Sequence, residues 1–212
     1  MAGASSAQDP PSKTEKIEWT WEVRPAHADP QLPNVLLLGD SITRNYYPEV
    51  EKQLTGFANV YLMATSASIG DPRLLRQIAD YSTAQPEHFN VVHFNNGMHG
   101  WDYSEAEYQE AFPAFLAELR TVAPKAAFVW ATTTPVKADV EPGPTNARIE
   151  ARNRIADSVV KSQGIRVDDQ HSLMNTHSDL YQDSVHFDEQ GAAIQGDQAA
   201  KVIRKVLAES RR

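Results

Sequence analysis

From residue 34 onward, short apolar runs alternate with longer segments of helical spacing, and this alternation most limits the possible folds. The apolar runs that we expect to form strands are 34–38, 58–63, 90–94, 126–131 and 164–167. The segments with apolar residues along one helical face are 71–82, 104–122, 146–162 and 189–208. Strands that are apolar almost throughout are typical of a parallel sheet covered by helices on both faces. The pattern therefore predicts an α/β fold, a three-layer α/β/α sandwich with a five-stranded parallel sheet.

Local start signals support two of these helices. Asp71 is an expected N-cap, with Pro72 at the first helical position. Ser104 and Glu107 have the spacing of a capping box, although Pro113 should kink or interrupt the helix that follows. A sandwich of this flavodoxin-like architecture binds ligands beyond the carboxyl ends of its strands. We therefore expect a site at the strand exits.

Residues 1–33 have a different character, with five prolines and no helical period. Between residues 17 and 23, Trp19 and Trp21 alternate with polar residues, which is the pattern of a half-buried strand. We expect 1–33 to form a leader and a surface arm whose tryptophans cover apolar area, and 34–212 to form the folded domain. The start of the chain is small and polar and shows no signal peptide. We expect an exported protein (periplasmic or secreted) if the start methionine replaced a native signal, and a cytoplasmic one otherwise.

Composition excludes several classes of function. The formal net charge of −8 argues against nucleic acid and against an anionic membrane surface as partners. The chain has no cysteine, which excludes thiol catalysis, disulfides and cysteine-ligated metals. No apolar run reaches transmembrane length. No glycine-rich phosphate loop and no clear metal-ligand spacing occur, so we expect neither a cofactor nor a metal, and the oligomeric state stays open.

A serine, Ser41, follows the first expected strand in the stretch GDSI. A serine hydroxyl becomes a nucleophile when a base takes its proton, usually a histidine that is oriented by a carboxylate. His186 lies directly before the last expected helix, and Asp183 precedes it by three residues, so that one tight turn would join their side chains. The alternative is structural: Asp183 caps a turn and His186 is an ordinary surface residue.

A hydrolase also needs hydrogen-bond donors where the oxyanion develops. The candidates are the backbone N–H groups of Ser41 and Gly70 and the side-chain amide of Asn95 or Asn96. The N–H of Ser41 would be free because Ser41 begins a helix or a turn. Each candidate has a structural alternative, since Gly70 can be a simple turn residue and the asparagines can cap strand ends.

Together these motifs resemble the SGNH hydrolase superfamily, also called GDSL-like lipases and esterases, over residues 34–208. The most specific blocks are LLLGDSIT near the start and DSVHFDEQG near the end. The resemblance implies a serine esterase in which Ser41 is the nucleophile, His186 the base and Asp183 the carboxylate that orients the base. It also implies an oxyanion hole made by the N–H groups of Ser41 and Gly70 and one asparagine amide.

The third block departs from the Gly-x-Asn-Asp form that is frequent in this superfamily. Aligned on Gly97, His99 occupies the position of the asparagine. The stretch FNNG at 94–97 instead resembles the form found in carbohydrate O-acetyl esterases and in relatives of plant polysaccharide O-acetyltransferases. On that resemblance the amide belongs to Asn95, with Asn96 as second choice, and the substrate is an acylated sugar.

The short chain without an inserted lid favours a small acyl group, acetyl above all. His99 and Trp101, after the third strand, and Thr134, after the fourth, are expected to bind the substrate. For the first two, packing in the core or at the rim is an equal alternative. We expect a small-molecule or carbohydrate ester as partner. Two other functions stay open: an O-acyltransferase with the same triad and a non-catalytic carbohydrate-binding module.

Overall fold

The computed structural model describes residues 11–84 and 88–210, so the expected leader at 1–10 lies outside the described residues. A six-stranded sheet runs through the centre in the order β1-β3-β2-β4-β5-β6. Its strands are β1 (Thr20–Val23), β2 (Asn34–Gly39), β3 (Asn59–Thr65), β4 (Val91–Phe94), β5 (Ala127–Ala131) and β6 (Arg166–Asp168). Strands β2 to β6 are parallel to one another, as the apolar runs predict.

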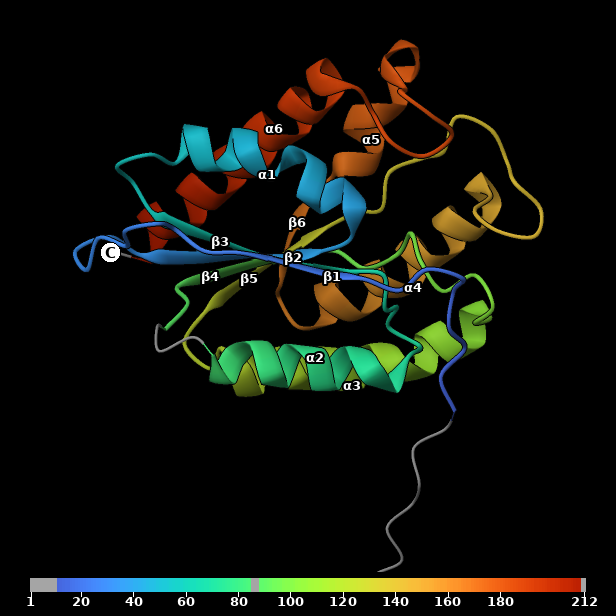
Figure 1. The fold of residues 1–212 in the computed structure, drawn as a ribbon, viewed down its shortest axis with the longest axis horizontal. Coiled ribbons are helices and arrows are strands. Elements are labelled where there is room, and N and C mark those ends of the chain that lie inside the picture. Colours follow the sequence, from blue (N-terminus) through green and yellow to red (C-terminus); the bar gives the residue numbers. More distant parts are fainter. Residues whose placement is uncertain (1–10, 85–87, 211–212) are drawn as a thin grey trace, which may run out of the picture.

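Helices cover both faces of this sheet and complete three layers (Figure 1). One face carries α1 (Ser41–Gln53) and α6 (Glu189–Glu209), with the short helices α5 (Gln170–Asn175) and η1 (Ser178–Leu180) nearby. The other face carries α2 (Pro72–Thr83), α3 (Glu105–Val122) and α4 (Asn146–Ser162). A buried apolar cluster fills the space on each face. The expected α/β/α class is confirmed.

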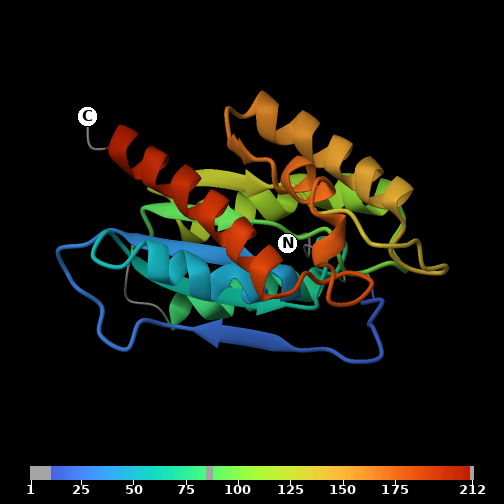
Figure 2. The ribbon, with the colours of Figure 1, turned by 90° about the horizontal axis from the view of Figure 1, so that it is seen from above.

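The sheet contains one strand more than the five that the sequence predicts. β1 pairs antiparallel with β3 and forms the edge of the sheet (Figure 2). Trp19 packs half-buried against the core, whereas Trp21 is 52% exposed and covers little apolar area. Alternation predicts a strand in the arm but not its place in the sheet, because that pairing joins distant segments and leaves no local signal.

The strand order places a natural crevice beside Ser41. β2 has β3 on one side and β4 on the other, so the connections that leave β2 and β4 diverge. Ligands in such sheets bind at this switch point, outside the carboxyl ends of the strands. Ser41 directly follows β2, and the segment that begins at Asn95 directly follows β4.

Helix α3 begins as its sequence predicts but does not break where expected. Ser104 and Glu107 form the capping box. The helix then runs continuously through Pro113, which is exposed, while Phe112 and Phe115 on the buried side anchor it in the core. Across the described residues, no helix combines the length and apolar character needed to span a bilayer.

Candidate active site

Ser41, His186 and Asp183 form a chain of hydrogen bonds at the carboxyl edge of the sheet. Ser41 is the first residue of α1, and its Oγ lies 2.7 Å from His186 Nε2. Asp183 Oδ2 lies 2.8 Å from Nδ1 of the same imidazole. A carboxylate at Nδ1 requires the proton on that nitrogen, which leaves Nε2 to accept the hydrogen bond from the Ser41 hydroxyl. The structure therefore brings together the three side chains that the sequence suggests as nucleophile, base and orienting carboxylate.

The turn that carries Asp183 and His186 is held by the same carboxylate. Asp183 Oδ1 accepts hydrogen bonds from the N–H groups of Val185 and His186, both at 2.7 Å. Desolvation of the Asp183 carboxyl raises its pKa, but these bonds and the imidazole outweigh it and hold the pKa below its usual value. Asp183 is therefore ionised at neutral pH and keeps the His186 ring in one orientation.

The turn before Ser41 explains the residues that flank the serine. Asp40 is the N-cap of α1, and its Oδ1 accepts the N–H of Ile42 at 2.9 Å. A Cβ atom at Gly39 would lie 2.1 Å from Thr43 Oγ1, so glycine is required there. Ser41 is the first helical residue, and its N–H therefore has no acceptor within the helix. That N–H is a candidate oxyanion donor.

A pocket of about 370 Å³ lies over Ser41 and His186. Three further segments line it: the N-terminal arm, the loop after β4 and a loop before α4. The lining residues from these segments are Lys13, Glu15, Lys16, Met98, His99, Gly100, Trp101, Asp102, Pro142, Gly143 and Pro144. Of the residues expected to bind substrate, His99 and Trp101 lie in this pocket.

The contribution of the N-terminal arm is not predicted by the sequence. Glu15 Oε1 accepts the N–H of Gly100 at 2.9 Å, and Glu15 Oε2 lies 3.0 Å from His99 Nδ1. The N–H of Lys13 donates to the Tyr103 hydroxyl at 2.7 Å. Glu15 and His99 are 84 residues apart, so no local pattern marks the arm as part of the pocket wall.

The two asparagines proposed as oxyanion donors are both hydrogen-bonded within the protein. The amide of Asn95 donates to Ala131 O at 2.7 Å and to Thr133 Oγ1 at 3.0 Å. The amide of Asn96 donates to Ala67 O at 2.8 Å, and its Oδ1 accepts the N–H of Ile69 at 2.9 Å. Both side chains are buried: Asn95 joins the exits of β4 and β5, and Asn96 joins the exits of β4 and β3, the two strands that flank β2. The Asn95 amide uses both of its N–H groups in these bonds, whereas the Asn96 amide uses one, so a role of Asn96 in the oxyanion hole stays a prediction.

Gly70 and Thr134 also lie outside the pocket. Gly70 packs against the ring of Tyr103. Thr134 is 2% exposed and lines a small separate cavity together with Ile42 and Gln195. Neither residue is among those that line the pocket over Ser41. Their expected roles, as oxyanion donor and as substrate contact, stay predictions.

A buried arginine fixes the loop that carries His99 and Trp101. Arg152 is 1% exposed and donates to four carbonyl groups, those of Gly97, His99, Gly100 and Tyr103. Its guanidinium carbon lies 4.2 Å from the centroid of the Trp101 ring. Burial lowers the pKa of Arg152 to about 10, so it stays charged at neutral pH. Its position on the apolar face of α4 is the signal that could have identified it from sequence.

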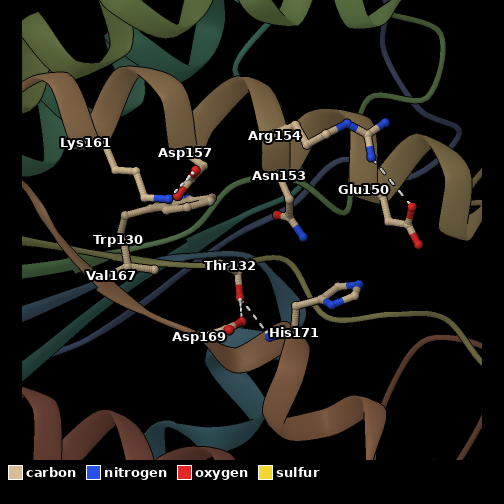
Figure 3. A pocket seen from close by; sticks show the side chains of 10 residues that line it. All are labelled: Trp130, Thr132, Glu150, Asn153, Arg154, Asp157, Lys161, Val167, Asp169 and His171. Atoms are coloured by element: carbon tan, nitrogen blue, oxygen red, sulfur yellow. Dashed lines mark hydrogen bonds and ion pairs between the residues drawn. The ribbon is translucent and has the colours of Figure 1, made fainter.

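A larger groove of about 610 Å³ lies apart from this pocket, between α4 and the exits of β5 and β6 (Figure 3). Ion pairs occupy its α4 side: Lys161 Nζ lies 2.8 Å from Asp157 Oδ2, and Arg154 Nη1 lies 3.6 Å from Glu150 Oε2. Its lining includes neither the serine nor the histidine of the hydrogen-bonded chain. The groove is therefore a polar surface separate from the Ser41–His186–Asp183 chain.

A second ionisable pair is fully buried. His93 Nε2 lies 2.8 Å from Asp168 Oδ2, and the amides of Gln170 and Gln198 also donate to this carboxylate. Both ionisable side chains have no exposed surface, so substrate cannot reach them. Within the described ranges, no group of three or more histidine, aspartate or glutamate side chains is placed to hold a metal ion.

Comparisons with solved structures show where this fold recurs. A member of the lipolytic G-D-S-L family from Veillonella parvula is 16% identical with a TM-score of 0.63, over 81% of this chain and 98% of the other. A carbohydrate esterase family 3 protein from Talaromyces cellulolyticus is 17% identical with a TM-score of 0.64, over 84% and 99%. An acetyl esterase, solved as a serine-to-alanine mutant with acetate, is 17% identical with a TM-score of 0.66, over 84% and 99%. At such identities the likeness shows a shared fold.

The family itself is shown by sequence. Residues 37–194 match the model of the GDSL-like Lipase/Acylhydrolase family, a range that includes Ser41, Asp183 and His186. Curated proteins give no significant match. The match covers well over half of the chain and agrees with the architecture described above. The chain therefore belongs to the GDSL-like lipase/acylhydrolase family and is a carboxylic ester hydrolase.

Proposed function

We propose that this protein is a serine esterase that forms a covalent acyl-enzyme at Ser41. The observation that carries the proposal is the 2.7 Å contact between Ser41 Oγ and His186 Nε2, with Asp183 2.8 Å from the other ring nitrogen. Such a chain of contacts supplies a nucleophile, its base and a group that orients the base. The match to an ester-hydrolase family supports the same chemistry.

In the first half-reaction, Ser41 Oγ attacks the ester carbonyl while His186 Nε2 takes the hydroxyl proton. The tetrahedral oxyanion collapses, the bond to the alcohol oxygen breaks, and His186 returns its proton to the leaving alcohol. In the second half-reaction, His186 takes a proton from water, and the hydroxide attacks the acyl-enzyme. The carboxylic acid leaves as the proton returns to Ser41 Oγ. Asp183 stays ionised throughout and stabilises the imidazolium.

The substrate that the pocket supports best is a small acyl ester, acetyl above all, on a carbohydrate. A volume of about 370 Å³ is near the lower end for ligand pockets, which leaves little cover for a long acyl chain. Trp101 lines the pocket, and Trp19 packs edge-on to His99 with ring centroids 5.8 Å apart. Trp21 contacts the same guanidinium as Trp19, that of Arg44, and is 52% exposed. A carbohydrate esterase and an acetyl esterase share this fold, which supports the same substrate class.

Two alternative functions would require different properties of the site. An acyltransferase forms the same acyl-enzyme and delivers the acyl group to an alcohol instead of water. A non-catalytic binding module has no need for a serine held against an oriented histidine. The Ser41–His186–Asp183 chain therefore favours an enzyme, and product analysis separates hydrolysis from transfer.

Hydrolysis of p-nitrophenyl acetate by the wild type, Ser41→Ala and Ser158→Ala tests the proposal. Ser158 is an exposed serine on α4 and serves as the matched control. We expect Ser41→Ala to lose roughly 10³-fold or more of kcat, by analogy with other triads, while Ser158→Ala keeps wild-type activity. A Ser41→Ala variant with the wild-type rate would overturn the proposal. Acetylated mono-, oligo- and polysaccharides, assayed beside p-nitrophenyl esters of increasing chain length, then define the substrate.

A further inference from the structure

His99 has an unusual environment for a loop residue beside a nucleophile. It lies in the loop after β4 and lines the pocket together with Ser41 and His186. Its Nδ1 lies 3.0 Å from Glu15 Oε2, on the side of the N-terminal arm. The carbonyl of His99 accepts a hydrogen bond from Arg152 at 2.7 Å, so both the backbone and the ring are fixed.

The other ring nitrogen has no partner. Among the described residues, no hydrogen-bond partner lies within reach of His99 Nε2, and the atom is buried. Asp40 Oδ2 is buried and unpartnered in the same way. Asp40 directly precedes Ser41 and acts electrostatically on the His99 ring. Buried polar atoms without partners are rare in folded proteins, and they often mark a functional group. One of these two atoms belongs to a residue that lines the pocket with Ser41, and the other belongs to the residue that directly precedes Ser41.

The surroundings favour the charged form of the His99 ring. Desolvation lowers the pKa of His99, but the hydrogen bond to Glu15 and the charges of Asp40, Glu15 and Glu18 outweigh it and raise the pKa above its usual value. Desolvation likewise raises the pKa of Glu15, and the contacts with His99 and Gly100 outweigh it and lower the pKa. Both shifts stabilise an ion pair between the arm and the loop.

We propose that the His99 imidazolium stabilises the oxyanion that forms beside Ser41. This inference rests on the proposed function and names a further group that acts on the reaction. His99 keeps its proton and forms no bond during either half-reaction. Its positive charge acts on the developing negative oxygen from a side chain that is only 17% exposed, where electrostatic stabilisation is stronger than in water. Glu15 is then a positioning residue, because it holds the ring and its charge.

Substitution of His99 provides the first test, with p-nitrophenyl acetate as substrate. We expect His99→Ala to lower kcat on the order of 10²-fold, as the loss of one oxyanion donor does, with KM little changed. His99→Asn, which supplies a neutral amide, should recover part of this loss. His27→Asn, a change at an exposed histidine remote from the pocket lining, is the matched control and should keep wild-type activity. A wild-type kcat in folded His99→Ala would overturn the inference.

The pH profile tests the charge directly and does not depend on folding of the alanine variant. Because His99 must carry its proton, kcat of the wild type should fall as pH rises through the raised pKa of His99. Glu15→Gln removes the carboxylate that contributes most to raising that pKa, so the alkaline fall should move to lower pH. In His99→Asn the fall should disappear. The other ionisable groups that face the ring or share its pocket are all kept in these variants: Glu18, Asp40, Arg152, Lys13, Lys16, Asp102 and His186. An alkaline limb that is identical in all three proteins would contradict the inference.

Covalent labelling separates failure of this inference from failure of the proposed function. A fluorophosphonate ester should label Ser41 in the wild type, as seen by intact mass. Absence of labelling and of esterase activity in the wild type would reject both the esterase and the role of His99. Labelling and turnover in the wild type, together with undiminished kcat in His99→Ala, would reject the role of His99 alone.

Discussion

His186 Nε2 lies 2.7 Å from Ser41 Oγ, although the two residues are 145 positions apart in the chain. Each lies next to the start of a helix, Ser41 at the start of α1 and His186 shortly before α6. The two helices pack closely where a Cβ at Gly196 would lie 2.9 Å from Tyr46 O, so glycine permits their approach. The geometry of the candidate site therefore depends on the packing of one helix pair over the sheet.

Removal of the base should be as damaging as removal of the nucleophile. We expect His186→Ala to lower kcat by roughly 10³-fold or more, because Ser41 then has no group to accept its proton. The double variant with Ser41→Ala should be no worse than either single variant, since the two residues act as a unit. Steady-state kinetics with p-nitrophenyl acetate measures this. Losses that multiply in the double variant would show that the two side chains act independently.

Asp183→Asn should lower kcat by roughly 10²- to 10⁴-fold, because an amide no longer fixes the proton on Nδ1 of His186. Asp179→Asn, at a neighbouring exposed aspartate, is the control and should leave kcat unchanged. Equal kinetics for the two variants would contradict the orienting role of Asp183.

The stability that Asp183 contributes should depend on pH in a defined direction. Its pKa in the folded protein lies below the usual value of 3.8, so its contribution is complete above that value and is lost as pH falls through the lowered pKa. The difference in Tm between the wild type and Asp183→Asn should therefore be constant from neutral pH to about pH 5 and should shrink in stronger acid. A difference that grows on acidification would contradict the assigned shift.

Arg152→Met should destabilise the protein, because it leaves four carbonyl groups of the loop after β4 without their buried donor. We expect a loss of about 3 kcal/mol or more in the free energy of unfolding, measured by urea denaturation. Arg154→Met removes an arginine that is 70% exposed and should change the free energy by about 0.5 kcal/mol at most. Similar effects of the two substitutions would show that the buried contacts of Arg152 contribute little.

Trp21 allows a test of the carbohydrate substrate without disturbing the core. Its exposed ring stacks on Arg44, whose guanidinium carbon lies 5.3 Å from the ring centroid. Loss of one sugar–aromatic contact worth about 1 kcal/mol corresponds to a several-fold effect. We expect Trp21→Ala to lower kcat/KM several-fold for acetylated oligosaccharides and to leave p-nitrophenyl acetate hydrolysis unchanged. Equal effects on both substrates would argue against a sugar-binding edge at β1.

Elements with strong local signals could be predicted from sequence. The N-cap Asp71 and the Ser104 capping box mark the starts of α2 and α3, and apolar runs mark the five parallel strands. The pairing of β1 with β3 could not be predicted, because an edge strand is chosen by long-range register and not by its own pattern. At Pro113 a local signal is present but misleading, because the buried neighbours Phe112 and Phe115 hold the helix together through this helix breaker.

The residues of the candidate site likewise fall into those that the sequence could predict and those that it could not. Ser41, Asp183 and His186 could be proposed as a group because motif order and strand exits point to one place. The choice between Asn95 and Asn96 could not be made, because it depends on where two adjacent amides point, and both donate to backbone oxygens. Glu15 left no signal at all, since its contact with His99 is made only when the arm docks on the folded loop.

The acyl-enzyme at Ser41 is the central claim, and intact mass spectrometry during turnover of p-nitrophenyl acetate tests it most directly. Acid quenching should trap one acetyl group per wild-type chain, and peptide mapping should place it on Ser41. Ser41→Ala should gain no acetyl group, and Ser158→Ala should match the wild type. Turnover by the wild type with no acetylated chain, or with the acetyl group on another residue, would contradict the account.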